Sequence, residues 1–302
     1  MKMNIKNILF PAFILAVSAG FTACSEEDLS DEPSMIVTPN TETNDFDLWL
    51  TANFCKPYNI DYKYRYEHIE GDYSYYLVPA RYEDAITMAH LIKYLCIETY
   101  NEVAGSDFTC SYFPKMFYTV GEWEYKNNGT FVLGSAEGGR KIFLAGLNYL
   151  SESVKDPQQL NEYYFKTIHH EFTHILNQTK PIPASFQTVT YSGYVSDMWS
   201  ESPYNTEYLN NGFISNYAQH SYTEDFAEMV SIYVTNPASY WEETVGQANE
   251  DAQAAIAQKL DIVRNYMESN FGIDLDQLRE VLQRRQQDVA SGIVDLSDLS
   301  IN

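Results

Sequence analysis

Hydrophobic residues recur at helical spacing in five stretches of the chain. Residues 82–103 carry apolar side chains three and four positions apart, with Glu83 and Asp84 in the first turn, which predicts a helix. The same spacing predicts four more helices, over residues 160–178, 221–235, 249–270 and 275–290.

Between residues 113 and 146 the pattern changes to short β-favouring runs separated by turn residues. Asn127-Asn128-Gly129 is the strongest hairpin signal, and we expect three or four short strands here. Residues 181–219 are rich in Pro, Ser, Asn, Gly and Tyr, which predicts an irregular loop. The expected fold class is α+β, with a small, mostly antiparallel sheet packed on the helix at 160–178 and a helical C-terminal part.

The N-terminus has the pattern of an export signal. Lys2 and Lys6 precede an apolar stretch, residues 8–21, that is too short to span a bilayer comfortably. A Phe-Thr-Ala-Cys sequence ending at Cys24 resembles a bacterial lipobox, so we expect residues 1–23 to be a lipoprotein signal peptide and Cys24 to be lipidated. A simple secretory signal that leaves Cys24 free is the alternative.

Residues 24–45 are acidic and poor in large apolar groups, which predicts a flexible tether. The acidic run also resembles the surface-export signal of some gram-negative outer-membrane lipoproteins, although a solvated linker is equally compatible. Both interpretations attach the protein to a membrane by its lipid. The remaining residues, 46–302, suit one domain with a helical C-terminal part.

The net charge and the cysteine content limit which partners and which kind of metal site the protein can have. With 42 acidic against 19 basic residues, a net charge of −23, the chain would be repelled by nucleic acid and by anionic lipid headgroups. Besides Cys24 there are Cys55, Cys96 and Cys110, so at most one disulfide forms within the chain. Cys96 should be a buried thiol, and without a C-x-x-C pair a cysteine-based metal site is not expected.

Residues 170–174 read His-Glu-Phe-Thr-His, an H-E-x-x-H motif within a predicted helix. His170 and His174 are four apart and therefore share a helix face, where two imidazoles can bind one Zn²⁺ ion. Glu171 beside them could act as general base toward water. An ordinary amphipathic helix with two histidines on its wet face is the alternative.

A catalytic zinc site needs a third protein ligand, and Glu224 is the best candidate. Glu224 and Glu228 lie four apart on the next predicted helix, where a cation facing them would remove their repulsion. Glu228 could then accept a hydrogen bond from a ligand histidine. Ser221-x-x-Glu224 is also a capping box, in which Glu224 would only close the helix start, and Asp225 is a weaker rival ligand.

These residues together resemble the gluzincins, most closely the lethal-factor-like branch with its E-x-F-A-E helix. The resemblance implies a zincin-like fold, with zinc on His170, His174 and Glu224, and with Glu228 bracing His170. It also implies that Tyr217, seven residues before Glu224, assists the transition state. With the lipobox, the chain resembles the substrate-import-associated zinc metallohydrolase lipoproteins, which implies an outer-membrane, surface-exposed protein near a TonB-dependent importer.

Tyr217 is also a candidate without the resemblance, because a phenol near the metal can donate a hydrogen bond to a developing oxyanion. Tyr222 or His220 could fill this role instead. The remaining histidines, His68, His90 and His169, are expected to be structural.

The expected function is zinc-dependent hydrolysis, most simply of a peptide bond in a peptide or glycopeptide. A surface accessory lipoprotein of an import complex, with a vestigial metal site, is the alternative. The intact Glu171 argues against it, because a binding module gains nothing from a general base.

The lipobox generates the first prediction. Cys24→Ser should yield a soluble or unprocessed precursor, because the acyl chains that hold the protein in a bilayer attach to this thiol. Detergent-phase partitioning of the full chain measures this. Partitioning that Cys24→Ser leaves unchanged would contradict the lipobox interpretation.

Overall fold

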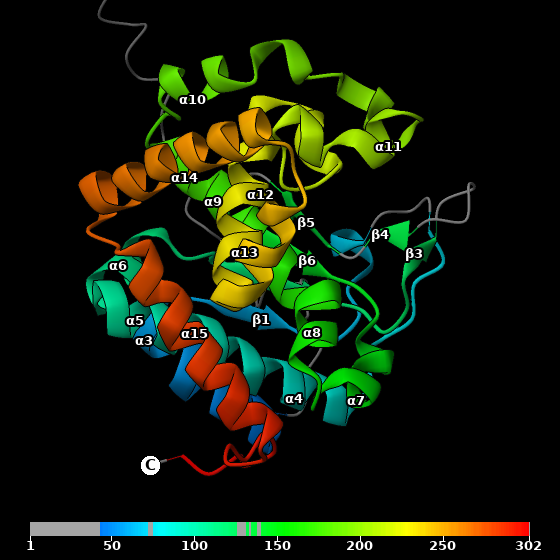
Figure 1. Ribbon diagram of the computed structural model, residues 1–302. Helices are drawn as coiled ribbons and strands as arrows, with labels where there is room; N and C mark the ends of the chain where they lie inside the picture. The colour runs from blue at the N-terminus through cyan, green and yellow to red at the C-terminus, as the bar shows by residue number, and fades with distance from the viewer. Residues whose placement is uncertain (1–42, 72–74, 126–130, 133, 138–139, 302) are drawn as a thin grey trace, which may run out of the picture. The chain divides into compact units, whose positions relative to one another are not determined.

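The computed structural model describes residues 43–71, 75–125, 131–132, 134–137 and 140–301, which belong to one compact unit, Thr43–Asn302. The predicted signal peptide, Cys24, the tether up to residue 42 and the predicted hairpin turn at residues 127–129 lie outside the described residues. The helices are α2 (Asp45–Leu50), α3 (Lys56–Tyr58), α4 (Tyr82–Leu91), α5 (Glu98–Ala104), α6 (Ser106–Tyr112), α7 (Leu150–Ser153), α8 (Pro157–Leu160), α9 (Lys166–Thr179), α10 (Ala184–Val189), α11 (Tyr204–Glu207), α12 (Tyr222–Thr235), α13 (Ala238–Gly246), α14 (Glu250–Phe271) and α15 (Leu275–Ala290) (Figure 1).

All five predicted helices are confirmed within a residue or two at each end. The first is α4 and α5 joined by a π-helical stretch, Ile92–Ile97, and the second is α9 preceded by a similar stretch, Asn161–Phe165. The others are α12, α14 and α15. Helix α13 was not predicted.

The main sheet has four strands in the order β1-β2-β6-β5. Strands β1 (Asp61–Lys63), β2 (Met116–Thr119) and β6 (Lys141–Leu144) are parallel, and only β5 (Gly134–Glu137) runs antiparallel to its neighbour β6. Two further strands, β3 (Glu124–Tyr125) and β4 (Phe131–Val132), form a separate antiparallel pair.

The prediction of a mostly antiparallel sheet is therefore wrong. It assumed antiparallel pairing between strands that follow one another in sequence, and this holds only for β3 with β4 and for β5 with β6. Strand β1 was not predicted; it reaches β2 through α4, α5 and α6, and a crossover of this length permits parallel pairing. Strand β2 then pairs with β6, although β3, β4 and β5 lie between these two strands in the sequence.

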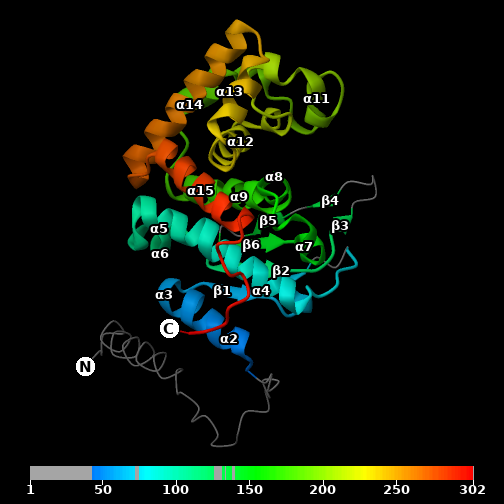
Figure 2. The same ribbon diagram turned by 60° about the horizontal axis from the view of Figure 1, so that its bottom comes forward.

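Helix α15 lies beside the helical run from α4 to α5 in both views of the chain (Figures 1 and 2). Arg285 pairs with Glu98 at 3.0 Å and with Glu102 at 2.9 Å, so the C-terminal part closes against the first half of the unit. These pairs are partly exposed and add little stability, whereas buried apolar residues such as Leu278 and Leu282 contribute more.

Helix α9 is held between two sets of neighbours. The buried ring of Phe172 lies 5.0 Å, between centroids, from the rings of both Tyr100 and Phe113. The opposite face of α9 packs along α12. Because α9 is fixed on its aromatic side, its other side meets α12 at a defined distance.

Residues 184–219 are not the irregular loop that the sequence predicted. They form six short helical pieces: α10, α11 and four 3-10 turns at residues 191–193, 196–200, 209–211 and 217–219. Phe186 and Phe213 are fully buried and anchor this segment to the core. The polar composition suggested a loop because about half of the segment's residues are exposed to solvent.

A buried ion pair ties this segment to two long helices. Asp225 of α12 and Lys259 of α14 have fully buried side chains, with Lys259 Nζ 2.7 Å from Asp225 Oδ2. Lys259 also donates to the carbonyl oxygen of Gly212, and the Tyr194 hydroxyl donates to Asp225. A buried charge without its partner is strongly destabilising, so these contacts hold the segment in place.

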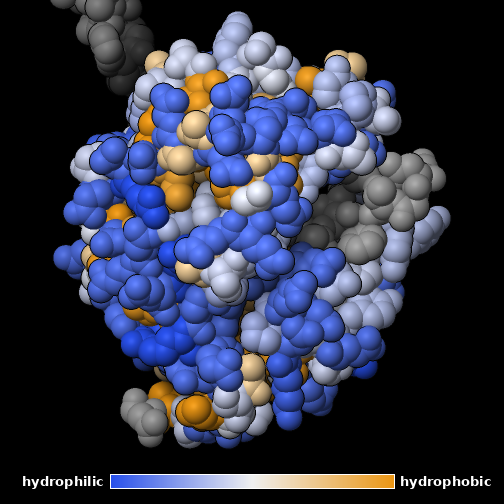
Figure 3. Space-filling model, in the orientation of Figure 1, coloured by the Kyte–Doolittle hydropathy of each residue, from blue (hydrophilic) through white to orange (hydrophobic). Residues whose placement is uncertain are grey.

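The face of the molecule in Figure 3 is mostly hydrophilic, with hydrophobic residues in small, scattered groups. No helix among the described residues is both long enough and apolar enough to cross a bilayer.

Candidate metal centre

The two motif histidines lie on the face of α9 that meets α12. Ile168, Phe172 and Leu176 follow the helical period and are buried on another side of α9, which turns His170 and His174 toward α12. Their rings are 4.7 Å apart between centroids and nearly perpendicular. The alternative of two histidines on a wet helix face does not hold for His170, which is 7% exposed.

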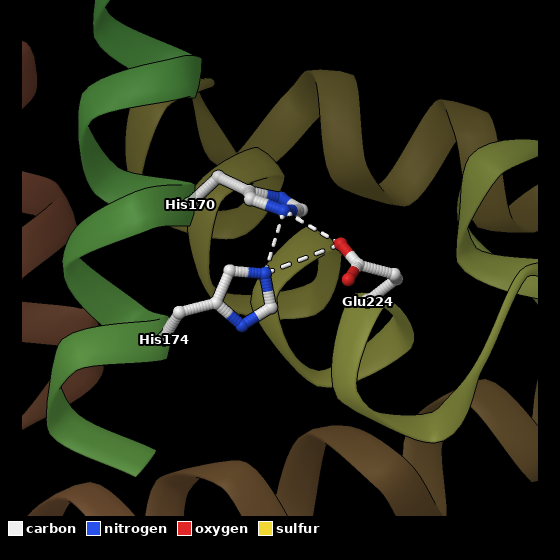
Figure 4. Close-up of side chains that lie close together, drawn as sticks. All are labelled: His170, His174 and Glu224. Atoms are coloured by element: carbon white, nitrogen blue, oxygen red, sulfur yellow. Dashed lines mark hydrogen bonds and ion pairs between the residues drawn. The ribbon is translucent and has the colours of Figure 1, made fainter. Parts of the chain in front are cut away.

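Three donor atoms converge between the two helices (Figure 4). The Oε2 atom of Glu224 lies 2.9 Å from His170 Nε2 and 3.2 Å from His174 Nε2, and the two Nε2 atoms are 3.1 Å apart. Ligands at about 2.0–2.1 Å from a tetrahedral zinc ion are roughly 3.4 Å from one another. Two imidazole nitrogens and one carboxylate oxygen, this close together, fit a zinc ion.

Glu224 does not close a capping box. The Ser221 hydroxyl accepts the hydrogen bond from the backbone N–H of Glu224 at 3.3 Å, so Ser221 is the N-cap of α12. The carboxylate of Glu224 turns instead toward His170 and His174. The backbone N–H of Glu224 therefore takes part in the helix cap, while its carboxylate belongs to the proposed metal centre.

Asp225 is placed away from the histidines, in its buried pair with Lys259. The sequence had ranked it as the weaker rival of Glu224, and the geometry agrees.

Glu228 lies one turn further along α12 and is 1% exposed. Its Oε1 atom accepts a hydrogen bond from His170 Nδ1 at 2.9 Å, and its Oε2 atom accepts from Ser215 at 2.6 Å and lies 2.9 Å from Lys166 Nζ. Because Nδ1 donates to Glu228, Nε2 is the His170 nitrogen that faces Glu224 and that can give its lone pair to a metal ion.

The charges at the site favour a cation. Burial by itself would lower the pKa of His170, yet its hydrogen bonds with Glu224 and Glu228 raise the pKa to about 9. Burial by itself would raise the pKa of Glu228, yet Lys166, His170 and Ser215 lower it to about 2. The pKa of Glu224 likewise falls well below its usual range because the two histidines outweigh the effect of burial. A pair of ionised carboxylates therefore flanks the point where the donor atoms meet.

Glu171 and Tyr217 line a small hollow of about 160 Å³ together with Lys166, His170 and Glu228. The Tyr217 ring lies 6.0 Å from that of His170, while the rival Tyr222 is 36% exposed. Burial, and then the charge of Glu224, raise the pKa of Tyr217 well above its ordinary value. The phenol therefore keeps its proton at neutral pH.

Two aromatic side chains hold Tyr217 in this position. Trp199 meets its ring edge-on at 5.1 Å, and His220 stacks on it at 5.8 Å. His220 is also 3.4 Å from Asp197. His220, the other alternative to Tyr217 as hydrogen-bond donor to the oxyanion, thus packs against Tyr217 itself.

The histidines expected to be structural include His169 and His90. His169 is fully buried, with Nδ1 2.9 Å from the Tyr100 hydroxyl, and burial lowers its pKa to about 4. His90 stacks on Trp49 and bonds to the carbonyl oxygen of Ile86. Both fit the structural interpretation.

Cys96 is fully buried, as expected, and burial raises the pKa of its thiol. Cys55 and Cys110 are exposed, and none of the three forms a disulfide.

Sequence reasoning did not find Lys166 and Ser215. Lys166 lies four residues before His170, so helical spacing could have placed it on the same face. No local signal marks Ser215, because its contact with Glu228 arises only when residues 184–219 fold against α12.

Comparison with known proteins supports a zinc site. Residues 39–276 match a family described as "putative zinc-binding metallo-peptidase". A crystal structure described as that of a putative zinc-binding metallo-peptidase from Bacteroides caccae ATCC 43185 is 37% identical to this chain. The match covers 88% of this chain and 100% of that chain, with a TM-score of 0.75. No curated protein matches.

The division of roles between Ser221 and Glu224 can be tested with zinc. Glu224→Ala should weaken zinc binding by at least about 100-fold, since loss of an outer partner alone costs about 10–100-fold. Ser221→Ala should instead cost about 1 kcal/mol of unfolding free energy and leave zinc affinity unchanged. Competition with a chromophoric chelator and urea denaturation measure the two effects. Equal zinc affinity in Glu224→Ala and wild type would show that Glu224 is not a zinc ligand and only caps α12.

Proposed function

The chain belongs to this family of "putative zinc-binding metallo-peptidases", and on that premise we propose that it is a zinc-dependent peptidase of the H-E-x-x-H type. In this proposal His170, His174 and Glu224 hold the metal and Glu171 is the general base. The observation that carries it is the meeting of three donor atoms within 3.2 Å of one another, contributed by two helices.

Bound zinc would supply Lewis-acid chemistry, polarising the substrate carbonyl and making water more acidic. Glu171, which follows His170 and lines the same hollow, takes the proton from the attacking water on its carboxylate. It then returns this proton to the nitrogen of the leaving amine, so one carboxylate serves both steps.

Tyr217 donates the hydrogen bond to the oxyanion in this proposal. Its raised pKa keeps the hydroxyl protonated, and Trp199 and His220 hold the ring against rotation. A donor that is fixed before the reaction needs no reorganisation when charge develops on the carbonyl oxygen.

Glu228 fixes the tautomer of His170. Because Glu228 accepts the Nδ1 proton at 2.9 Å, the Nε2 lone pair stays available to the metal.

We further infer a gluzincin of the lethal-factor-like branch and a lipoprotein anchored to the outer membrane through Cys24. The Glu224–Glu228 motif and the contact of Glu228 with His170 support the first inference. The lipobox-like sequence before Cys24 supports the second. Association with a TonB-dependent importer rests on the resemblance alone.

The test of the proposed function is Glu171→Gln in the zinc-loaded full-length protein. The variant should keep its fold and one zinc ion per chain, while kcat on a mixed peptide library falls by roughly 10²–10⁴, because an amide cannot accept the proton. Mass spectrometry of the products and metal analysis measure the two properties. Turnover close to wild type would show that Glu171 is not the base.

Tyr217→Phe should fold and bind zinc normally while kcat falls by at least roughly tenfold, because the lost hydrogen bond forms only in the transition state. Tyr222→Phe is the matched control, since Tyr222 is exposed and follows the N-cap of α12. A loss of rate in Tyr222→Phe but not in Tyr217→Phe would show that Tyr222, and not Tyr217, donates this hydrogen bond.

A further inference from the structure

A cavity of about 280 Å³ adjoins the proposed metal centre. Lys166 lines both this cavity and the hollow that contains Glu171. Ser215 and Asn216 line the cavity, and the next residue, Tyr217, lines the hollow. A peptide held at the metal centre would therefore have a nearby side chain within reach of the cavity.

Several helices line the cavity, and Figure 1 labels α8, α12 and α13 among them. Its lining comes from α8, the π-helical stretch Asn161–Phe165, the C-terminal end of α12, and α13. It is distinct from the donor set, because none of His170, His174 and Glu224 lines it.

The cavity lining contains one carboxylate, that of Glu162, which has no cationic partner among the described residues. Glu162 lies four residues before Lys166, the spacing at which a glutamate and a lysine on a helix usually pair. Lys166 turns instead to Glu228, at 2.9 Å, and the charges of that pair cancel. Within the part of the chain that the structure describes, no basic side chain forms an ion pair with Glu162.

The rest of the lining is neutral and includes two aromatic rings. Tyr208 and Tyr240 line the cavity, with Tyr240 43% exposed, and Ile214 and Ile232 give it an apolar surface. Aromatic faces attract guanidinium and ammonium groups. The net charge of −23 on the chain acts in the same direction at longer range.

We propose that this cavity is a substrate subsite for a basic side chain, arginine or lysine, close to the cleaved bond. The inference rests on the proposed peptidase function. Glu162 would pair with the positive charge, Tyr208 and Tyr240 would contact it through their ring faces, and the apolar surface would take the aliphatic part of the side chain.

Cleavage by the zinc-loaded full-length protein of matched peptides, with Arg, Lys or Gln at each position around the cut, tests the subsite. At one position kcat/KM should favour Arg or Lys over Gln. Glu162→Gln should lower this ratio roughly fivefold, the size expected for an exposed ion pair, and Glu162→Lys should lower it further. Glu280→Gln is the matched control, because Glu280 is an exposed glutamate of α15 outside the cavity, and it should keep the ratio.

The subsite is wrong if the wild-type protein shows no preference for a basic residue. It is also wrong if both Glu162 variants keep the preference, or if Glu280→Gln loses as much of it as Glu162→Gln. Cleavage without a basic preference would leave the peptidase assignment standing. No cleavage of any peptide would overturn the assignment and the subsite together.

Discussion

The geometry of the proposed metal centre depends on the hydrogen bonds and the ion pair of one buried carboxylate, that of Glu228. A carboxylate that is 1% exposed is stable as an anion only when donors surround it, and His170, Ser215 and Lys166 do so. These donors come from α9 and from the segment that precedes α12. One side chain of α12 thus fixes the helix spacing, the rotation of the His170 ring and the position of residues 215–217.

The sequence predicted the parts of the site that local spacing determines. His170 and His174 share a helix face because they are four apart, and Glu228 follows Glu224 at the same interval. It favoured Glu224 as the third ligand but left a capping role open, because Ser221-x-x-Glu224 satisfies the rule for a cap as well as that for a ligand. Only the packing of α9 on α12 brings this carboxylate to the two histidines.

Long-range pairing accounts for what the sequence analysis got wrong or missed. The parallel contacts of β1 with β2 and of β2 with β6 join strands that no short turn connects, so no turn signal marks them. Residues 184–219 looked like a loop because their helical pieces are shorter than the windows in which periodicity is visible. The contact of Ser215 with Glu228 exists only after this segment has folded.

Two neighbouring carboxylates at the start of α12 serve different sides of the helix. Glu224 faces the histidines, and Asp225, the next residue, neutralises Lys259 in the core. Successive helical residues differ in direction by about 100°, so each carboxylate can reach only its own partner. One residue inserted or deleted within the first turn of α12 would turn one of them away from that partner and leave Lys259 as an isolated buried charge. During divergence this turn should therefore tolerate substitution at its exposed position, Tyr222, but no change in length.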